Sequence, residues 1–251
     1  MGSSLMSISN TYIDGDSLIF KCSYGVEGNI PSKLKMKKRW KQAIKKIRSE
    51  TFADNIGIAL RGDDNFRVEL SPIYKKNRPK LADDVMGRIM WLDAWAKEQG
   101  AVAANGWEAD DLVCCWAYEA DKRGEAYVIA GIDKDLLQYP GNHYNYGGTA
   151  RKPKTDEEKW NFITPEAGQF ALFCQFLTGD STDNIIGIKG IGPAKANKAL
   201  KDKTPKEMME KIVEMYKDHW PKDWDEQLKM NTNLMYMRRF DNDEFNYRDY
   251  L

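Results

Sequence analysis

A short stretch in the C-terminal half of the chain combines two chemical signals. Asp180 and Asp183 stand three residues apart, and the turn Gly190-Ile191-Gly192-Pro193 follows them and opens a helix. Carboxylate oxygens are the ligands that hard divalent cations prefer, and backbone N–H groups at a helix start bind phosphate. One segment therefore carries a metal-ligand signal and a phosphate-backbone signal, which indicates a metal-dependent nuclease.

Further acidic residues occur in groups where a strand or helix is expected to begin or end. They are Asp14 and Asp16, Asp63 and Asp64, Glu108 with Asp110 and Asp111, and Asp133 with Asp135. Acids in the first turn of a helix often only complement its dipole, and this simpler reading suits each motif taken alone. The recurrence of such groups favours one acidic site.

Clustered carboxylates need a cation. Two carboxylates ~4 Å apart repel by about 4 kcal/mol at an effective dielectric constant of 20. Several pairs in one pocket would therefore destabilise the fold or become protonated unless metal ions were bound. Oxygen-only ligands suit Mg²⁺ or Mn²⁺, and two such ions can activate a water and stabilise the leaving oxygen of a phosphodiester.

The periodicity of apolar residues predicts strands that alternate with helices. Strands are expected at 11–13, 56–60, 101–104 and 126–130, and helices at 33–50, 83–99, 107–122, 164–177, 193–200, 205–216 and 223–240, with one more starting at 136. Such alternation predicts an α/β fold with a mostly parallel central sheet flanked by helices. Ligands then bind beyond the carboxyl ends of the strands, where Asp14, Asp63 and Asp133 are expected.

The charge of the chain is balanced but unevenly distributed. The 251 residues include 38 basic and 38 acidic side chains, and nine of the basic ones lie between Lys33 and Arg48. The predicted helix at 33–50 is therefore basic on its outer face, which fits a DNA-facing surface or an ordinary solvated helix equally well. A second mixture of aromatic and basic residues, Asn65-Phe66-Arg67 and Tyr74 to Arg78, suits a nucleic acid.

Several classes of protein are disfavoured. No apolar run approaches the ~20 residues that a membrane-spanning helix needs, and the N-terminus lacks the layout of a signal peptide. The four cysteines show no C-x-x-C spacing, so a reducing cytoplasm is expected. With only two histidines, a histidine-based zinc site is disfavoured.

Taken in order, these motifs resemble the 5′-nuclease (flap endonuclease) family, and most of all a stand-alone phage 5′–3′ exonuclease. The resemblance rests on Asp14-Gly15-Asp16, Tyr74-Lys75-x-Asn77-Arg78, Glu108-Ala109-Asp110-Asp111, Asp133-Lys134-Asp135, Gly179-Asp180-x-x-Asp183-Asn184 and the glycine turn. It implies a 5′-nuclease or PIN-like fold with a helical arch and a helix–hairpin–helix. The implied domains are a catalytic core at 1–162, a helix–hairpin–helix segment at 163–204, and C-terminal helices at 205–251 that pack back on the core.

The resemblance also implies roles for single residues. Asp14, Glu108, Asp110 and Asp111 would bind one ion, and Asp133, Asp135, Asp180 and Asp183 would bind the second. Lys75 and Arg78 would lie under the arch and contact the scissile phosphate. Duplex DNA would be held by the hairpin, commonly with a potassium ion. The expected DNA-binding residues are Arg67, Tyr74, Lys189, Gly190, Gly192 and Lys195, with both glycines able to adopt positive φ.

One position departs from the family pattern. The family usually has an aspartate at the end of the second strand, where this chain can place Gly62. Asp63 is the expected substitute, with Asp64 as the alternative. Asp16 matches a position that is often not acidic, so it is expected to be a neighbour of the metal ligands.

The implied function is removal of nucleotides or short flaps from 5′ ends of duplex DNA, and of RNA from RNA–DNA hybrids, as in primer removal during replication. A replication polymerase or a single-strand-binding protein is an implied partner, in the host cytoplasm if a phage encodes the chain. Two rival functions are a non-catalytic, structure-specific DNA-binding module and a phosphatase-like metal hydrolase for small substrates.

Overall fold

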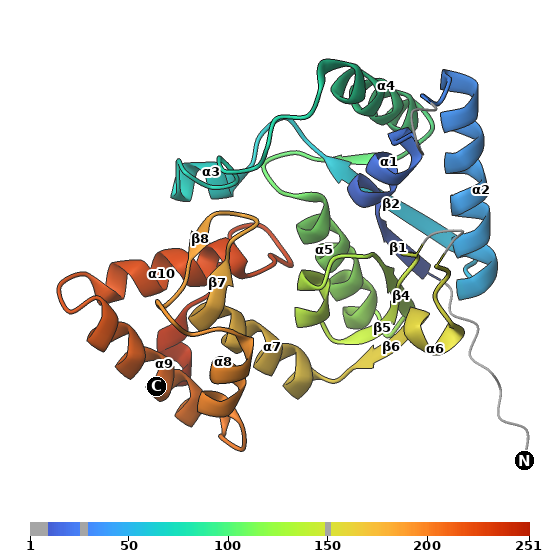
Figure 1. Cartoon of the computed structure of the whole chain (residues 1–251). Helices are drawn as coiled ribbons and strands as arrows, with labels where there is room; N and C mark the ends of the chain where they lie inside the picture. Colours follow the sequence, from blue (N-terminus) through green and yellow to red (C-terminus); the bar gives the residue numbers. More distant parts are fainter. Residues whose placement is uncertain (1–9, 26–29, 149–151) are drawn as a thin grey trace, which may run out of the picture. The chain divides into compact units, whose positions relative to one another are not determined.

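The computed structural model describes residues 10–25, 30–148 and 152–251. The chain divides into two compact units (Figure 1). The first comprises the residues up to 64 together with 80–136 and 141–162, and the second comprises 65–79, 137–140 and 163–251. The sequence prediction separated 163–204 from 205–251, whereas the structure gathers both segments into the second unit.

The first unit is built on a six-stranded sheet with the order β3-β2-β1-β4-β5-β6 in the described part of the chain. Its strands are β1 (Asn10–Asp14), β2 (Asn55–Arg61), β3 (Val102–Ala104), β4 (Tyr127–Ala130), β5 (Gly141–Tyr144) and β6 (Trp160–Ile163). β1 pairs in parallel with β2 and β4, β2 with β3, and β4 with β5. The predicted α/β fold with a mostly parallel sheet is confirmed.

Helices cover both faces of this sheet. α1 (Gly15–Ser23), α2 (Lys33–Thr51) and α4 (Asp83–Glu98) pack against one another, and their apolar residues share a core with Ile13 and Leu60. α5 (Ala109–Lys122) lies on the other face, where Trp116 contacts the ring of Tyr12. Neighbouring residues of a strand point to opposite faces, so Tyr12 and Ile13 each bury one face of the sheet.

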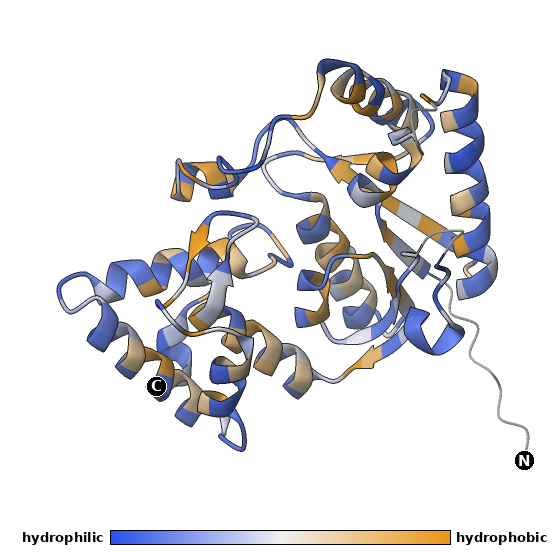
Figure 2. Ribbon diagram, in the orientation of Figure 1, coloured by the Kyte–Doolittle hydropathy of each residue, from blue (hydrophilic) through white to orange (hydrophobic). Residues whose placement is uncertain are grey.

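α2 is polar along nearly its whole length (Figure 2). Met36, Trp40 and Ile47 form its buried stripe, and lysines cover the rest of its surface. Lys37 lies over the rings of Trp91 and Trp95 of α4, 5.4 Å and 4.9 Å from their centroids. The ammonium thus remains charged on an aromatic surface, which anchors the basic helix without a carboxylate partner.

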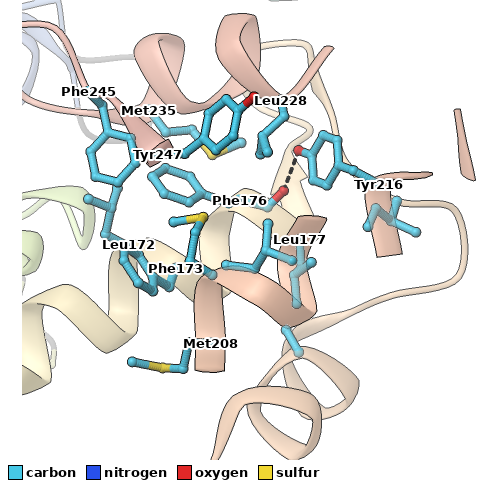
Figure 3. Packing of buried hydrophobic residues seen from close by; sticks show 14 of the residues in the cluster. Leu172, Phe173, Phe176, Leu177, Met208, Tyr216, Leu228, Met235, Phe245 and Tyr247 are labelled. Atoms are coloured by element: carbon cyan, nitrogen blue, oxygen red, sulfur yellow. Dashed lines mark hydrogen bonds between the residues drawn. The ribbon is translucent and has the colours of Figure 1, made fainter. Parts of the chain in front are cut away.

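The second unit is a group of helices around a separate aromatic core (Figure 3). It contains α3 (Phe66–Leu70), α7 (Pro165–Thr178), α8 (Pro193–Leu200), α9 (Pro205–His219) and α10 (Trp224–Met235). Phe173 and Phe176 of α7 are fully buried against Phe245, and the hydroxyl of Tyr216 donates to the carbonyl of Phe176 (2.6 Å). The C-terminal helices therefore share their core with α7 and α8, and their packing on the catalytic core stays a prediction.

Residues 65–79 contain the short helix α3 followed by turns, and Pro72 and Pro79 interrupt a longer helix. The helical arch implied by the resemblance stays a prediction. One predicted element bound is wrong. The helix expected at 223–240 ends at Met235. Shorter elements that the periodicity did not reveal are α1, α3, α6 (Asp156–Lys159), β5 and β6. No helix of the described residues is both long and apolar enough to span a bilayer.

Candidate active site

Asp14 lies at the carboxyl end of the central strand β1, next to the ends of β2 and β4. Its carboxylate caps α1 by accepting a hydrogen bond from the backbone N–H of Asp16 (3.1 Å). Only 6 % of the residue is exposed. Topology alone thus places a carboxylate where parallel α/β folds bind their ligands.

The surroundings of Asp14 disfavour its ionised form. Burial, followed by the negative charge of Asp16, raises the pKa of Asp14 from 3.8 to about 7, and the charge of Asp133 adds to this effect. Because a buried carboxylate next to like charges is costly, a bound cation would stabilise the ionised form. This site can therefore accept a divalent ion.

Asp16 has a local structural role. It accepts a hydrogen bond from the backbone N–H of Arg61 (3.0 Å), which joins the start of α1 to the end of β2. Burial raises its pKa, and the charges of Asp93 and Glu108 add to the effect. Asp93 was not singled out from the sequence because it lies inside the α4 helix pattern, where it pairs with Lys97 (2.9 Å).

Glu108 and Asp111 form a reciprocal capping box at the start of α5. The Asp111 carboxylate accepts from the backbone N–H of Glu108 (3.0 Å), and the Glu108 side chain accepts from the backbone of Asp111. Asp111 is fully buried, whereas Asp110 between them is partly exposed. The simpler reading of acids at a helix start thus applies to two residues of this motif, in addition to any role as ligands.

The structure separates the roles of Asp63 and Asp64 after β2. Asp64 accepts a hydrogen bond from the backbone N–H of Gly106 (2.5 Å), while Asp63 is exposed. Gly62 has no room for a side chain, because an added Cβ would lie 2.5 Å from the carbonyl oxygen of Ala104. A side chain therefore does not fit at Gly62, and the choice between Asp63 and Asp64 as a metal ligand stays a prediction.

Asp133 and Asp135 follow β4 and form a turn in which Asp133 accepts from the backbone N–H of Asp135 (3.0 Å). Among the described residues, no three acidic, cysteine or histidine side chains are grouped closely enough to hold a metal ion in their present conformations. The metal-ligand assignment stays a prediction.

Asp183 of the second unit is surrounded by positive charge. Its carboxylate lies 3.5 Å from Nζ of Lys75, forms an ion pair with Arg78, and accepts a hydrogen bond from the hydroxyl of Tyr74 (3.1 Å). Asp180 accepts from the backbone N–H groups of Thr182 and Asp183 (2.7 Å and 3.3 Å), which shapes the turn between β7 (Gly179–Asp180) and β8 (Ile185–Ile186). Residues 74–78 and 180–183 therefore form one cluster.

The backbone of this cluster holds an uncommon conformation. Lys75 has φ of 57°, in the left-handed region, and its N–H donates to the carbonyl of Asp183 (2.9 Å). The side-chain amide of Asn77 donates to the carbonyl of Ser181 (2.6 Å). A non-glycine residue in this region costs energy and often marks a functional site, so the strain at Lys75 supports a chemical role for its ammonium group.

The glycine turn follows β8 and leads into α8. Gly190 has φ of 81°, as expected, but Gly192 has φ of −96° and is the extended N-cap of α8. Both glycines are able to adopt positive φ, and of the two Gly190 does so. An added Cβ at either glycine would meet nothing within 4 Å. Lys195 donates to the carbonyl of Gly190 (2.8 Å), and Lys189 is exposed beside it.

Arg67 is engaged inside the second unit. Only 2 % of it is exposed, and its guanidinium donates to the carbonyls of Leu234 (2.8 Å) and Tyr236 (2.9 Å). Helix ends leave carbonyls without a partner, so Arg67 satisfies the end of α10 and stops that helix. The contact between Arg67 and DNA stays a prediction, and buried Tyr74 positions Asp183 through its hydroxyl.

Comparison with known proteins matches the sheet-containing part of the chain to one family. Residues 10–161 fit the model of the 5′-3′ exonuclease N-terminal, resolvase-like domain. The chain is 32% identical over 133 residues to a 5′-3′ exonuclease of Buchnera aphidicola, covering 51% of this chain and 45% of that protein. It is 29% identical over 143 residues to DNA polymerase I of Rhizobium leguminosarum, covering 55% of this chain and 14% of that protein.

Solved structures extend the likeness beyond this domain. The T5 protein co-crystallised with metal ions matches with a TM-score of 0.68 at 14% identity, covering 90% of this chain and 89% of that one. The bacteriophage T5 flap endonuclease in a complex with DNA and metal ions matches with a TM-score of 0.60 at 13% identity, covering 90% and 99%. At such identities the likeness shows the fold alone.

The raised pKa of Asp14 predicts how stability depends on pH. Between 3.8 and about 7 the folded protein holds this proton more tightly than the unfolded chain, so stability should fall as pH rises through this range. Each pKa unit corresponds to about 1.4 kcal/mol. The test is urea unfolding in excess chelator at pH 5 and pH 8. Between these pH values, the free energy of unfolding of Asp14→Asn should decrease by less than half as much as that of the wild type. Mg²⁺ should then stabilise the wild type at pH 8 more than the variant. Equal pH slopes for the two proteins would contradict the assignment.

Proposed function

The chain belongs to the 5′-3′ exonuclease family with the N-terminal resolvase-like domain, and from this premise we propose that it hydrolyses phosphodiesters at the 5′ ends of duplex DNA. The observation that carries the proposal is the buried carboxylate of Asp14, which lies beside other acids at the carboxyl edge of a parallel sheet. The named activities of its relatives support the proposal, although the chain covers less than half of the length of the two relatives described above.

The proposed reaction uses divalent cations. Asp14, Glu108, Asp110 and Asp111 are the candidate ligands of one Mg²⁺ or Mn²⁺, and Asp63, Asp133 and Asp135 are further candidates at the same sheet edge. When bound, such ions lower the pKa of a water nucleophile and stabilise the leaving oxygen. The desolvated carboxylate of Asp14 fits this use, because its charge has a cost that a cation removes.

Lys75 and Arg78 are the candidate catalytic cations. Cations held beside a phosphate stabilise the negative charge that develops during cleavage. Asp183 positions them, because it contacts both side chains and its backbone carbonyl accepts from Lys75. Asp180 and Asp183 also remain candidate metal ligands, in which case a cation would compete with Lys75 and Arg78 for the carboxylate.

The glycine turn is the proposed contact with duplex DNA. Lys189, Lys195, Gly190 and Gly192 lie on its exposed surface, where backbone N–H groups at the start of α8 can bind phosphate. A potassium ion at this turn, action on RNA–DNA hybrids, and cooperation with a replication polymerase or a single-strand-binding protein are further parts of the proposal.

Cleavage of 5′-labelled DNA tests the proposed function. Blunt, nicked and flapped duplexes should be cut with Mg²⁺ or Mn²⁺, and Ca²⁺ should support binding without turnover. Mononucleotide products indicate an exonuclease, and an intact released flap indicates an endonuclease. Full cleavage in excess chelator would exclude metal dependence, and metal-independent binding without any cleavage would identify a binding module.

Removal of the Lys75 ammonium group should slow the chemical step of cleavage. We expect Lys75→Ala to reduce single-turnover cleavage by about two orders of magnitude with little change in DNA affinity, since the charge acts mainly in the transition state. The neighbouring Lys76 is exposed and is the matched control. An unchanged rate with weaker binding of Lys75→Ala would make Lys75 a docking residue.

A substitution at Gly192 tests DNA binding separately from cleavage. Its φ of −96° suits any residue, and a side chain would meet nothing in the protein, so Gly192→Val should fold normally. If a phosphate backbone approaches this turn, valine should weaken Ca²⁺-supported duplex binding to a similar extent for all sequences. Gly87→Val, at another glycine with open space around it, is the control. A folded Gly192→Val protein with wild-type affinity would refute the role of the turn.

A further inference from the structure

The first unit contains a cavity of about 470 Å³ that the proposed chemistry does not use. It lies between α1, α2 and the segment that follows β5. We propose that this cavity, called here the α1–α2 cavity, binds a nucleoside 5′-monophosphate. Its volume is in the range of small-molecule sites in proteins.

The charge of the α1–α2 cavity favours an anion. Its described lining residues include the cations Lys21, Arg39, Lys46, Lys154 and Lys159, and no carboxylate is among them. The carboxylate of Glu50 forms ion pairs with Nζ of Lys46 (3.6 Å) and Nζ of Lys159 (3.2 Å). Within the described part of the chain, the other three form no ion pair. A phosphate dianion would supply the missing negative charge.

Two of these cations are held in place by uncharged partners. Nη1 of Arg39 donates to the carbonyls of Cys22 (3.2 Å) and Tyr24 (2.8 Å), and Nζ of Lys21 donates to the carbonyl of Tyr146 (3.0 Å). Carbonyl partners fix the side chains without cancelling their charge. The guanidinium keeps further N–H donors, and such a planar fork suits the oxygens of a phosphate.

The remaining lining suits a base and a sugar. Leu18, Ile47 and the two tyrosines Tyr144 and Tyr146 supply apolar and aromatic surface. Burial raises the pKa of Cys22, also in the lining, to about 11, so its thiol stays protonated at neutral pH. The lining thus offers a protonated thiol, and the proposed chemistry of the cavity is non-covalent binding.

Tyr146 connects the cavity to the acidic edge of the sheet. Its hydroxyl donates to the backbone carbonyl of Asp14 (2.5 Å), and its own carbonyl accepts from Lys21. The choice of a nucleotide over other anions rests on the proposed function, because 5′-nuclease action releases products that carry a 5′-phosphate. The ligand is either the free product or the 5′-terminal nucleotide of a strand, since the two share the same recognisable groups.

Binding measurements in excess chelator test the proposal without cleavage. dAMP should bind, and deoxyadenosine, which lacks the phosphate, should bind at least about tenfold more weakly, because it cannot accept charge-assisted hydrogen bonds from the lining cations. Lys154→Glu should weaken dAMP binding by a similar factor. Lys45→Glu, on the exposed side of α2 and outside the cavity, should leave it unchanged. Arg39→Lys provides a second lining variant that keeps the charge and loses the fork.

The outcomes separate this proposal from the nuclease assignment. Equal binding of dAMP and deoxyadenosine, or dAMP binding that survives Lys154→Glu in a folded protein, would overturn the cavity site. dAMP binding that is lost in Lys75→Ala instead would place the nucleotide at the cluster around Asp183. Lys154-dependent binding in a protein that cleaves no DNA would refute the proposed function alone. Competition between dAMP and a 5′-phosphorylated dinucleotide then distinguishes the free product from a strand end.

Discussion

The electrostatic cost of a buried carboxylate at the end of β1 is the constraint on which the first unit depends. Asp14 must lie there because β1 is the central parallel strand and its next residues start α1. Without a cation the negative charge is disfavoured, as the raised pKa of Asp14 shows. Three other acids accept hydrogen bonds from backbone N–H groups. Asp16 accepts from Arg61, Asp64 from Gly106 and Asp111 from Glu108. Hydrogen bonds from the backbone therefore hold these acids in place.

In the second unit, an acidic side chain is paired with basic side chains instead of backbone N–H groups. Asp183 is compensated by Lys75 and Arg78, which lie more than a hundred residues earlier in the chain. A short strained turn brings these cations to the carboxylate, with Lys75 in the left-handed region. Each partner fixes the other, so this cluster is preorganised by charge pairing, whereas acids at the sheet edge accept backbone hydrogen bonds. Preorganised charges of this kind are effective in catalysis because they need little rearrangement during the reaction.

Family membership and the geometry answer different questions. The match over residues 10–161 identifies the family, and the likeness to T5 structures shows the fold over 90% of the chain. Neither assigns a role to a single residue. The structure distinguishes Arg67, which ends α10, from Lys75, which is strained and partly exposed, although both lie in similar aromatic and basic motifs. It also reveals the α1–α2 cavity, whose cations come from three separate segments of the chain.

The sequence by itself determined the alternating order of strands and helices, because apolar periodicity and helix caps such as Thr164 and Thr204 are local signals. It also determined that an acid ends β1 and that acids follow β4. Tertiary structure alone decided the end of α10 and the extended conformation of Gly192, since each depends on partners distant in sequence or on backbone geometry that residue type does not specify. Gly62 shows the difference. The residue type alone permits many backbone conformations, whereas the nearby carbonyl of Ala104 in the folded chain explains why an aspartate side chain does not fit at this position.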